Sequence, residues 1–308
     1  MRALITGATG YIGTALARHL AGAGWDVHAL LRATSDPAQL LAVVPAVECH
    51  RPAERDGATS ALVATVDPDC VFHLAARIQS SHKADNIRPL IAANITLGVE
   101  LLEGLAQLNA TRSAAPSVLV AAGTYWAHDA GGADAPNSFY AASKRAFEAF
   151  MPFYARHANV PCCSLLLYDV YGPHDTRGKL IPALVENALV ADSSALAVSP
   201  GDQLLDLVHV DDVVRGFVVA ADGLRDGSVG PGRYRLDTGE RVTLKQLVVA
   251  IGAAVGRPPA VEFGARPYPP NQIMVPLETG PRLPGWTATV SLAQGLRTLL
   301  PAGPEASS

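Results

Sequence analysis

The sequence begins with a short apolar segment, Arg2–Thr6, that runs directly into a glycine-rich turn. Gly7 permits a tight turn, Gly10 lets the backbone approach a phosphate group, and Gly13 lets the next helix lie close to the sheet. The helix predicted over Tyr11–Ala23 would present free N–H groups to an anion. The pattern therefore predicts a strand–turn–helix unit that can hold a dinucleotide pyrophosphate, and a purely structural glycine turn is the alternative.

Short apolar runs alternate with helical stretches through the first half of the chain. The predicted strands are Arg2–Thr6, Asp26–Leu31, Ala46–Cys49, Cys70–Leu74, Ser117–Ala122 and Pro161–Tyr168. The predicted helices are Tyr11–Ala23, Asn86–Asn109 and Asn137–His157. Apolar strands separated by helices are typical of a parallel sheet that is covered on both faces. We therefore expect an α/β protein with a doubly wound parallel sheet.

Proline and glycine interrupt the second half, where the predicted elements are shorter. The predicted strands there are Asp206–Val210 and Tyr234–Asp237, and the predicted helices are Asp211–Ala221 and Thr243–Val255. We expect a first domain over residues 1–170, with a returning segment near 211–240. Residues 171–210 and 241–301 would form a smaller, partly discontinuous lobe, and 302–308 a loose tail.

Composition and charge narrow the function classes. The 308-residue chain is 49% apolar and 17% charged, which suits a compact globular protein. Its formal net charge of −4 gives no electrostatic reason to expect nucleic acid or a membrane surface as a partner. No run of about 18 apolar residues is apparent, and the strand-like start leaves no room for a secretory leader. We expect a cytoplasmic protein.

Neither the cysteines nor the histidines predict a metal site. The four cysteines lack ligand spacing and are too few, in a chain of this length, for a disulfide framework. His128, His174 and His209 also lack ligand spacing. His73 falls within a predicted strand, where we expect a buried structural role.

Tyr140 and Lys144 are four residues apart in a predicted helix, so they share a helical face. A free phenol has a pKa of about 10, and a neighbouring ammonium lowers that value by favouring the phenolate. Tyr140 could then exchange a proton with a carbonyl oxygen or a hydroxyl. Thr124, just past a predicted strand, is placed to offer a further hydroxyl. Alone, such a pair is common on helices for structural reasons, but together with the glycine turn it indicates an oxidoreductase acting on a carbonyl or carbinol carbon.

The end of the second strand bears on cofactor choice. An acidic residue there would hydrogen-bond the ribose hydroxyls of NAD. This chain has Arg32 instead, which could pair with a 2′-phosphate, helped by the hydroxyl of Thr34 or Ser35. A solvated arginine at a strand exit is the alternative. We therefore favour NADP(H), with NAD(H) still possible.

Taken together, the motifs resemble the extended short-chain dehydrogenase/reductase family, in its nucleotide-sugar epimerase/dehydratase branch. The resemblance spans most of the chain. The segments that carry it are Thr6–Gly13, Phe72–Ala76, Asn94, Tyr140–Lys144, Val170–Pro173, Leu180–Pro182, Asp206–Asp212, Gly285-Trp286 and Ser291–Leu296. It implies a Rossmann-type cofactor domain with a smaller C-terminal α/β substrate lobe.

The resemblance also implies roles for individual residues. Thr124, Tyr140 and Lys144 match the family's catalytic set. Leu74–Ala76 would line the phosphate and ribose side of the cofactor, and Tyr168 and Val170 would lie near the nicotinamide carboxamide. The full set of implied cofactor-binding positions is Gly7, Thr9, Gly10, Tyr11, Ile12, Gly13, Arg32, Leu74, Ala75, Ala76, Tyr140, Lys144, Tyr168 and Val170.

Departures from the family pattern bear on the reaction. Nucleotide-sugar 4,6-dehydratases carry Asp-Glu directly after the threonine, whereas this chain has Tyr125-Trp126, so dehydration is not expected. Gly123 stands where the family usually has a serine, and His50-Arg51 replaces an acidic residue that often follows the third strand. The stretch Gly123–Trp126 resembles reductases of 4-keto-6-deoxy nucleotide sugars.

We therefore expect NADPH-dependent reduction of the C4 ketone of a nucleotide-activated 4-keto-6-deoxysugar, with Tyr140 protonating the oxygen. A NAD-dependent nucleotide-sugar epimerase is the first alternative. A non-enzymatic NADP-sensing protein of the same fold is the second, and retention of Tyr140 and Lys144 counts against it. Substrate contacts would come from Thr124 and Tyr125 and from cations that could bind a diphosphate. These cations, each of which could equally be solvated, are Arg77, Arg177, Lys179 and Arg266.

Helices 86–109 and 137–157 commonly form a dimer interface in similar proteins. Phe147, Phe150, Met151 and Tyr154 could supply its apolar surface, or could pack within one subunit. We expect a homodimer.

Overall fold

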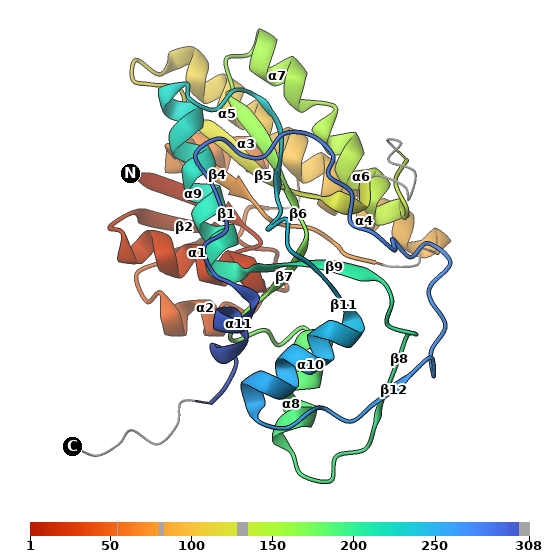
Figure 1. Ribbon diagram of the computed structural model, residues 1–308. Helices are drawn as coiled ribbons and strands as arrows, with labels where there is room; N and C mark the ends of the chain where they lie inside the picture. Colours follow the sequence, from red (N-terminus) through yellow and green to blue (C-terminus); the bar gives the residue numbers. More distant parts are fainter. Residues whose placement is uncertain (54, 80–82, 128–134, 302–308) are drawn as a thin grey trace, which may run out of the picture. The chain divides into compact units, whose positions relative to one another are not determined.

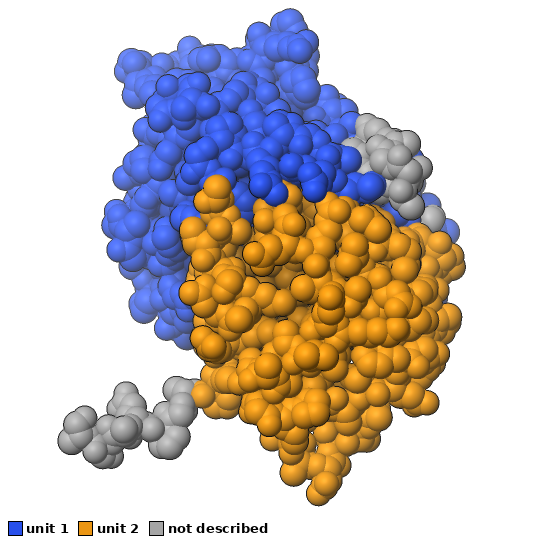
Figure 2. Space-filling view, in the orientation of Figure 1, with its two compact units in different colours: residues 1–167, 213–236, 277–286 blue, residues 168–212, 237–276, 287–308 orange. Residues whose placement is uncertain are grey.

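The computed structural model describes residues 1–53, 55–79, 83–127 and 135–301 (Figure 1). The predicted tail at 302–308 and His128 lie outside the described residues. The chain forms two compact units, which are coloured separately in Figure 2. The first unit comprises residues 1–167, 213–236 and 277–286. The second comprises, among the described residues, 168–212, 237–276 and 287–301.

Seven parallel strands form the sheet of the first unit, in the order β3-β2-β1-β4-β5-β6-β10. Their bounds are β1 Arg2–Thr6, β2 Asp26–Leu30, β3 Glu48–His50, β4 Cys70–His73, β5 Val118–Thr124, β6 Cys162–Leu167 and β10 Gly232–Leu236. From β1 the chain adds strands toward one edge of the sheet, through β2 to β3, and then crosses to the other side of β1 to form β4. In sheets of this kind, ligands bind at such a switch point, beyond the carboxyl ends of the strands. The predicted doubly wound α/β fold is confirmed.

Helices cover both faces of this sheet (Figure 1). They are α1 Tyr11–Gly22, α2 Ala38–Val43, α3 Ala58–Val66, α4 Ile87–Ile91, α5 Leu97–Thr111, α6 Phe139–Glu148, α7 Met151–His157 and α9 Val210–Asp226, which starts in the second unit. On one face, Val71 of β4 belongs to a core cluster with α3, α5, α6 and α7. The next residue, Phe72, points to the other face and meets Phe217 of α9 edge to face at 6.3 Å. Alternation along β4 therefore anchors both helical layers.

The predicted helix 137–157 is two helices in the structure. α6 ends at Glu148, and α7 begins at Met151 with Pro152 in its first turn. Proline has no N–H group, and its ring clashes with the carbonyl four residues earlier, so a continuous helix would break here. The predicted helix 86–109 is also interrupted, because a π-helical turn, Ala92–Thr96, separates α4 from α5.

The helical run Ala84–Thr111 is long and apolar enough to cross a membrane by length and composition alone. The expectation that no such stretch exists is wrong in that respect. Core helices of other proteins pass the same test, and one face of this run packs inside the first unit. Leu101, Leu102 and Leu105 of α5 are fully buried there.

The second unit is built from small sheets and short helices. One sheet has the order β11-β9-β7 and the other pairs β12 with β8. The elements are β7 Asp169–Tyr171, α8 Leu180–Leu189, β8 Leu196–Val198, β9 Leu204–His209, β11 Arg241–Thr243, α10 Leu244–Val255, β12 Val261–Phe263 and α11 Leu292–Arg297. Thr243 and Ser291 start α10 and α11 with full capping boxes, which explains the sharp beginnings of both helices. Leu184, Leu247 and Leu296 lie in the core of this unit.

Residues 277–286 belong to the first unit, although the predicted division placed them in the smaller lobe. The backbone N–H of Arg235 in β10 donates to the Pro281 carbonyl at 2.9 Å, and Arg235 and Arg282 form a parallel bridge. Trp286 is buried beside Gly216 of α9, where a Cβ would lie 3.2 Å from the indole nitrogen. This segment therefore extends the sheet edge at β10.

Candidate active site

The glycine turn has the close packing that a phosphate cradle needs. Gly7 adopts a φ of +72°, and the Gly10 N–H donates to the Gly7 carbonyl at 3.0 Å. A Cβ on Gly13 would overlap the Gly7 carbonyl oxygen, so only glycine lets α1 start directly on the turn. The first turn of α1 contains no acidic residue. The free N–H groups at this helix start fit the pyrophosphate of a dinucleotide.

The turn is tied to the segment that follows β4. The Thr6 hydroxyl is 2.9 Å from Nδ1 of His73 and accepts a hydrogen bond of 3.1 Å from the Ala75 N–H. The Leu74 N–H donates to the Thr6 carbonyl at 3.2 Å. The structure thus brings Leu74 and Ala75 beside Gly7, at the switch point between β1 and β4. His73 is fully buried, as expected, and burial and the Lys144 charge lower its pKa to about 3.

Tyr140 and Lys144 lie one turn apart on α6, which Ser138 caps by accepting from the Ala141 N–H. Lys144 is 2% exposed, and burial lowers its pKa to about 8. Burial and the Glu148 carboxylate raise the pKa of Tyr140 to about 12. The expectation that the tyrosine pKa is lowered is therefore wrong for this structure, because burial and the Glu148 carboxylate both disfavour the phenolate.

A buried hydrogen-bond chain fixes the backbone beside Tyr140. The Ser143 hydroxyl donates to the Tyr140 carbonyl at 2.7 Å and accepts from the Asn94 side chain at 2.8 Å. Asn94 also accepts from the Arg77 N–H at 2.7 Å and donates to the Arg77 carbonyl at 3.2 Å. Asn94 sits in the π-helical turn, and it therefore links α6 to the segment after β4. The sequence identified Asn94 only as part of the family resemblance and did not predict this linking role.

Sequence reasoning missed Glu148, a buried carboxylate one turn beyond Lys144. It accepts from the Ser164 hydroxyl at 2.6 Å and pairs with Arg233 at 3.0 Å and Arg145 at 3.4 Å. A Cβ on Gly123 would lie 2.5 Å from the Ser164 oxygen and 2.7 Å from the carboxylate. Glycine therefore replaces the family's usual serine at position 123 because Glu148 and Ser164 fill that space. In the sequence, the signal for Glu148 was its position four residues after Lys144, on the same helical face.

Thr124 is the last residue of β5 rather than the first residue after it, and it is 8% exposed. Its hydroxyl accepts from the Trp126 N–H at 3.2 Å. The Trp126 ring meets the Tyr140 ring edge to face at 6.5 Å and the buried Tyr125 ring at 6.3 Å. Trp126 thus connects the end of β5 to the catalytic candidate on α6, a contact that the sequence did not predict.

Arg32 follows β2 and is exposed. Among the hydrogen bonds of the described residues, Arg51 donates to the Ser35 carbonyl at 2.9 Å. A second guanidinium therefore reaches the loop that carries Arg32, Thr34 and Ser35. From the sequence, Arg51 was noted only as a departure from the family pattern, and no contact with this loop was predicted.

Five further predicted residues lie in the second unit. Tyr168 is buried and Val170 is half-buried in β7. Arg177 forms a two-point ion pair with Asp175, at 2.6 and 2.7 Å, so its charge already has a partner. The side chains of Lys179, at the start of α8, and Arg266, after β12, are exposed.

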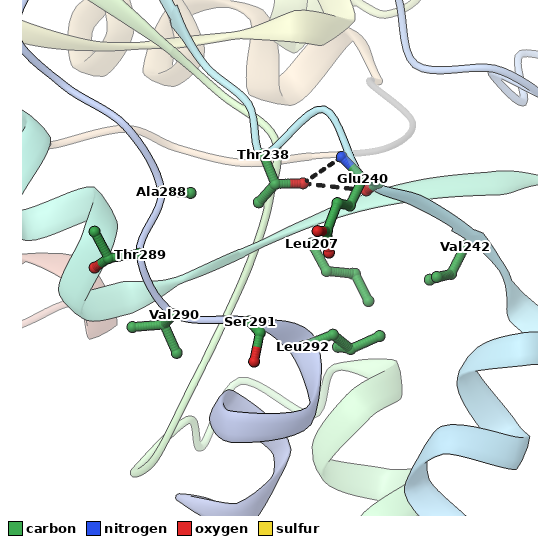
Figure 3. Close-up of a pocket in the computed structure, with 9 residues that line it drawn as sticks. All are labelled: Leu207, Thr238, Glu240, Val242, Ala288, Thr289, Val290, Ser291 and Leu292. Carbon is green, nitrogen blue, oxygen red and sulfur yellow. Dashed lines mark hydrogen bonds between the residues drawn. The ribbon is translucent and has the colours of Figure 1, made fainter.

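The second unit also contains a pocket of about 230 Å³ (Figure 3). Thr238 and Glu240 lie on one side of it, and the segment from Ala288 to Leu292 lies on the other. Two buried aspartates hold these walls. Asp206 accepts from Thr238 at 2.8 Å, and Asp212 accepts from the Thr289 hydroxyl at 3.0 Å. The pocket contains none of the predicted site residues.

Comparison with known proteins places this arrangement in a family. Residues 3–234 match the model of the NAD-dependent epimerase/dehydratase family. The chain is 30% identical to a UDP-glucose 4-epimerase of Mycolicibacterium smegmatis over 96% of each chain. It is 25% identical to a CDP-abequose synthase of Yersinia pseudotuberculosis, over 90% of this chain and 92% of that one.

Solved structures show the same fold. A UDP-glucose 4-epimerase of Thermotoga maritima, solved with UDP-glucose, matches with a TM-score of 0.78 at 21% identity. Another from Thermus thermophilus, solved with NAD, matches with a TM-score of 0.76 at 24% identity. Each match covers 97% of both chains. The chain belongs to the NAD-dependent epimerase/dehydratase family, in the nucleotide-sugar branch of the extended short-chain dehydrogenases/reductases.

Proposed function

We propose that this protein uses NADPH to reduce the C4 ketone of a nucleotide-activated 4-keto-6-deoxysugar. The observation that carries the proposal is the pair of Tyr140 and Lys144, which lie one turn apart on α6, together with the Thr124 hydroxyl at the carboxyl end of β5. Ketone reduction requires a proton donor, and a buried phenol whose pKa is raised stays protonated at neutral pH. Lys144, with a pKa of about 8, is mainly cationic at pH 7 and stabilises the phenolate that forms as the proton leaves.

Bound NADPH would supply the hydride, and the chain's own residues would supply the rest. As C4 accepts that hydride, its C=O double bond would become a single bond and the oxygen would take the Tyr140 proton to give a hydroxyl. The Thr124 hydroxyl, at the carboxyl end of β5, orients the ketone oxygen by a hydrogen bond. Solvent returns a proton to Tyr140 after the product leaves.

The choice of NADPH rests on Arg32 and on the second cation near it. Arg32 is exposed where an acidic residue would select NAD, and Arg51 binds the same loop through the Ser35 carbonyl. Two guanidinium groups can pair with a 2′-phosphate. We further propose that Gly7–Gly13, Leu74–Ala76, Tyr168 and Val170 line the cofactor.

The proposal of a nucleotide-sugar substrate is supported by the names of the relatives. One is named for making a CDP-linked sugar, and another acts on UDP-glucose. Tyr125 and Trp126 cannot act as the acid–base pair of a dehydratase, so ketone reduction is favoured over loss of water. We propose the second unit as the substrate lobe. Arg77, Lys179 and Arg266 are the cations best suited to a diphosphate, because Asp175 already neutralises Arg177.

A NAD-dependent epimerase is the second candidate. The 30% identity to a UDP-glucose 4-epimerase favours it. An epimerase would copurify with NAD and would interconvert hydroxyl configurations without consuming reductant. A reductase would oxidise one NADPH to NADP⁺ for each ketone that it reduces.

The deciding experiment follows NADPH oxidation against a panel of nucleotide 4-ketosugars, with product stereochemistry checked by NMR. Simple aryl ketones and a 3-oxoalkanoate serve as comparison substrates, since one relative is named as a 2-alkyl-3-oxoalkanoate reductase. Turnover confined to the ketosugars supports the proposal. Reduction of the comparison substrates alone would defeat the sugar assignment.

A homodimer also remains a proposal, with a smaller candidate surface than the sequence suggested. Phe147, Met151 and Tyr154 are buried within one subunit, whereas Phe150 is 43% exposed. Phe153 on α7 is 58% exposed and Ile91 on α4 is 39% exposed, so these two side chains and Phe150 are apolar groups that a partner copy could cover. Light scattering that gives the mass of one chain would reject the dimer. We also propose a cytoplasmic location.

A further inference from the structure

The edge of the large sheet brings two histidines and two carboxylates onto one face. β2 and β3 pair in parallel, and their register places His28 opposite Glu48 and Leu30 opposite His50. Side chains alternate along a strand, so Asp26, His28, Glu48 and His50 point to the same side of the sheet. These residues lie in the first unit and take no part in the proposed reaction.

Three of these side chains turn their donor atoms toward one another. Nδ1 of His28 lies 2.8 Å from Nε2 of His50. One Glu48 carboxylate oxygen is 3.7 Å from the His28 nitrogen, and the other is 3.7 Å from the His50 nitrogen. Ligand atoms of a tetrahedral zinc ion, bound at about 2.0–2.2 Å, are about 3.3 Å apart. The nitrogen–nitrogen distance of 2.8 Å is shorter than that value, and the two nitrogen–oxygen distances of 3.7 Å are longer.

Asp26 supplies the outer partner that metal-binding histidines need. Its carboxylate lies 3.3 Å from Nε2 of His28, the ring nitrogen that points away from the other donors, in an ion pair that lacks hydrogen-bond geometry. The Arg2 guanidinium holds the same carboxylate at 2.8 Å. A carboxylate behind a histidine fixes which nitrogen carries the proton and turns the other lone pair toward a metal. His28 is 7% exposed, so its ring is held in place by packing as well.

One hydrogen bond joins the facing ring nitrogens of the two imidazoles, and which ring carries its proton depends on the tautomer. The ring planes differ by 13° and the ring centres are 5.1 Å apart, so the rings meet edge to edge rather than face to face. A metal in place of that proton would open the gap between the nitrogens. β3 has three residues and is the edge strand, and the Glu48 side chain is 66% exposed. Strand and side chain can therefore adjust at little cost.

We propose that His28, His50 and Glu48 bind one divalent transition-metal ion of the zinc class, with Asp26 orienting His28. Two imidazoles and one carboxylate suit Zn²⁺, whereas Mg²⁺ and Ca²⁺ prefer oxygen ligands alone. Three protein ligands leave one position for water. The ion would bridge β2 to the edge strand β3, next to the loop that carries Arg32, because the His50 carbonyl accepts from the Leu31 N–H at 2.9 Å.

The test titrates the chelator-treated full-length protein with Zn²⁺ by calorimetry, and with Co²⁺ by visible absorption, which reports a tetrahedral site. We expect saturable binding of one ion per chain and a raised melting temperature. H50Q should abolish this binding, E48Q should weaken it at least tenfold, and D26N should weaken it by about 10–100-fold. H19Q changes an exposed histidine of α1 outside the cluster and is the matched control.

E48Q keeps the test decisive if a histidine variant folds poorly, because Glu48 is largely exposed. Circular dichroism of each variant checks the fold before titration. Absence of saturable Zn²⁺ binding in the unaltered protein would overturn the proposal. Equal Zn²⁺ affinity in E48Q and the unaltered protein, or an equal loss in H19Q, would overturn it as well.

Discussion

Gly7 lies against the backbone of Ala75: a Cβ on Gly7 would be 2.7 Å from the Ala75 nitrogen. The contact joins the turn after β1 to the segment after β4, on the two sides of the switch point between these strands. No side chain fits between them, so the position of the proposed phosphate cradle is set by backbone packing.

Replacing Gly7 by alanine should therefore harm both folding and cofactor binding. The φ of +72° costs a residue with a Cβ about 1–2 kcal/mol, and the contact with Ala75 adds to that cost. Gly22→Ala is the matched control, because no atom lies within 4 Å of a Cβ there. That change should stabilise α1 by about 0.5–1 kcal/mol. Urea unfolding and a cofactor titration of both variants check this, and equal stability of the two would contradict it.

Tyr140→Phe should remove the proton donor while leaving the cofactor site intact. We expect kcat to fall by about 10²–10⁴-fold, the usual contribution of a general acid, with unchanged cofactor affinity. Tyr154→Phe on α7 is the control: it loses a hydroxyl that donates to Glu103 at 3.1 Å and should retain full turnover. Steady-state kinetics with the substrate found in the panel measures both. Full activity in the Tyr140 variant would remove the tyrosine from the mechanism.

Lys144→Met should stabilise the protein at pH 7 while abolishing turnover. Burial lowers the Lys144 pKa from 10.5 to about 8, so the unfolded chain holds this proton more tightly than the folded one. Below pH 8 the buried charge therefore costs up to about 3 kcal/mol of stability, and this cost fades as the pH rises toward 10.5. The gain from methionine should shrink over the same range.

Urea unfolding at pH 7 and at pH 9.5 tests this sign. Lys83→Met, at an exposed position, should change stability little at either pH. A Lys144→Met variant that is less stable than the unaltered protein at pH 7 would show that the ammonium has a stabilising partner.

Arg32→Gln should weaken NADPH binding by about 10–150-fold and leave NADH binding unchanged, because a charge-assisted hydrogen bond contributes about 1.5–3 kcal/mol. Arg18→Gln changes an exposed arginine on α1 and serves as the control. Fluorescence titration with each cofactor separates the two effects. Equal losses for NADPH and NADH would mean that Arg32 does not contact the 2′-phosphate.

The first-unit fold was predictable from local patterns. Each apolar run between Arg2 and Leu167 became a strand close to its predicted bounds, because buried parallel strands are apolar throughout. The break at Pro152 was readable too, but the amphipathic pattern on both sides masked it. The return of residues 277–286 to β10 depends on contacts such as Arg235 with Pro281, which no local pattern encodes.

The sequence predicted Thr124, Tyr140 and Lys144 as members of the candidate site, but neither Glu148 nor the electrostatics of the site. The spacing of Tyr140 and Lys144 was enough to place them on one face of α6. The direction of the tyrosine pKa depends on burial and on Glu148, which only the packed structure reveals. His28 and His50 are separated along the chain, and only the register of β2 with β3 brings them together.

The interleaving of the two units limits how this protein can be dissected. The first unit takes its last segment, 277–286, from beyond most of the second, so no single cut releases it whole. Truncation after residue 276 would strip β10 of its Arg282 bridge and α9 of Trp286. Chimeras that aim to exchange specificity between relatives must therefore graft 168–212, 237–276 and 287–301 as one set, and splice junctions belong at those boundaries.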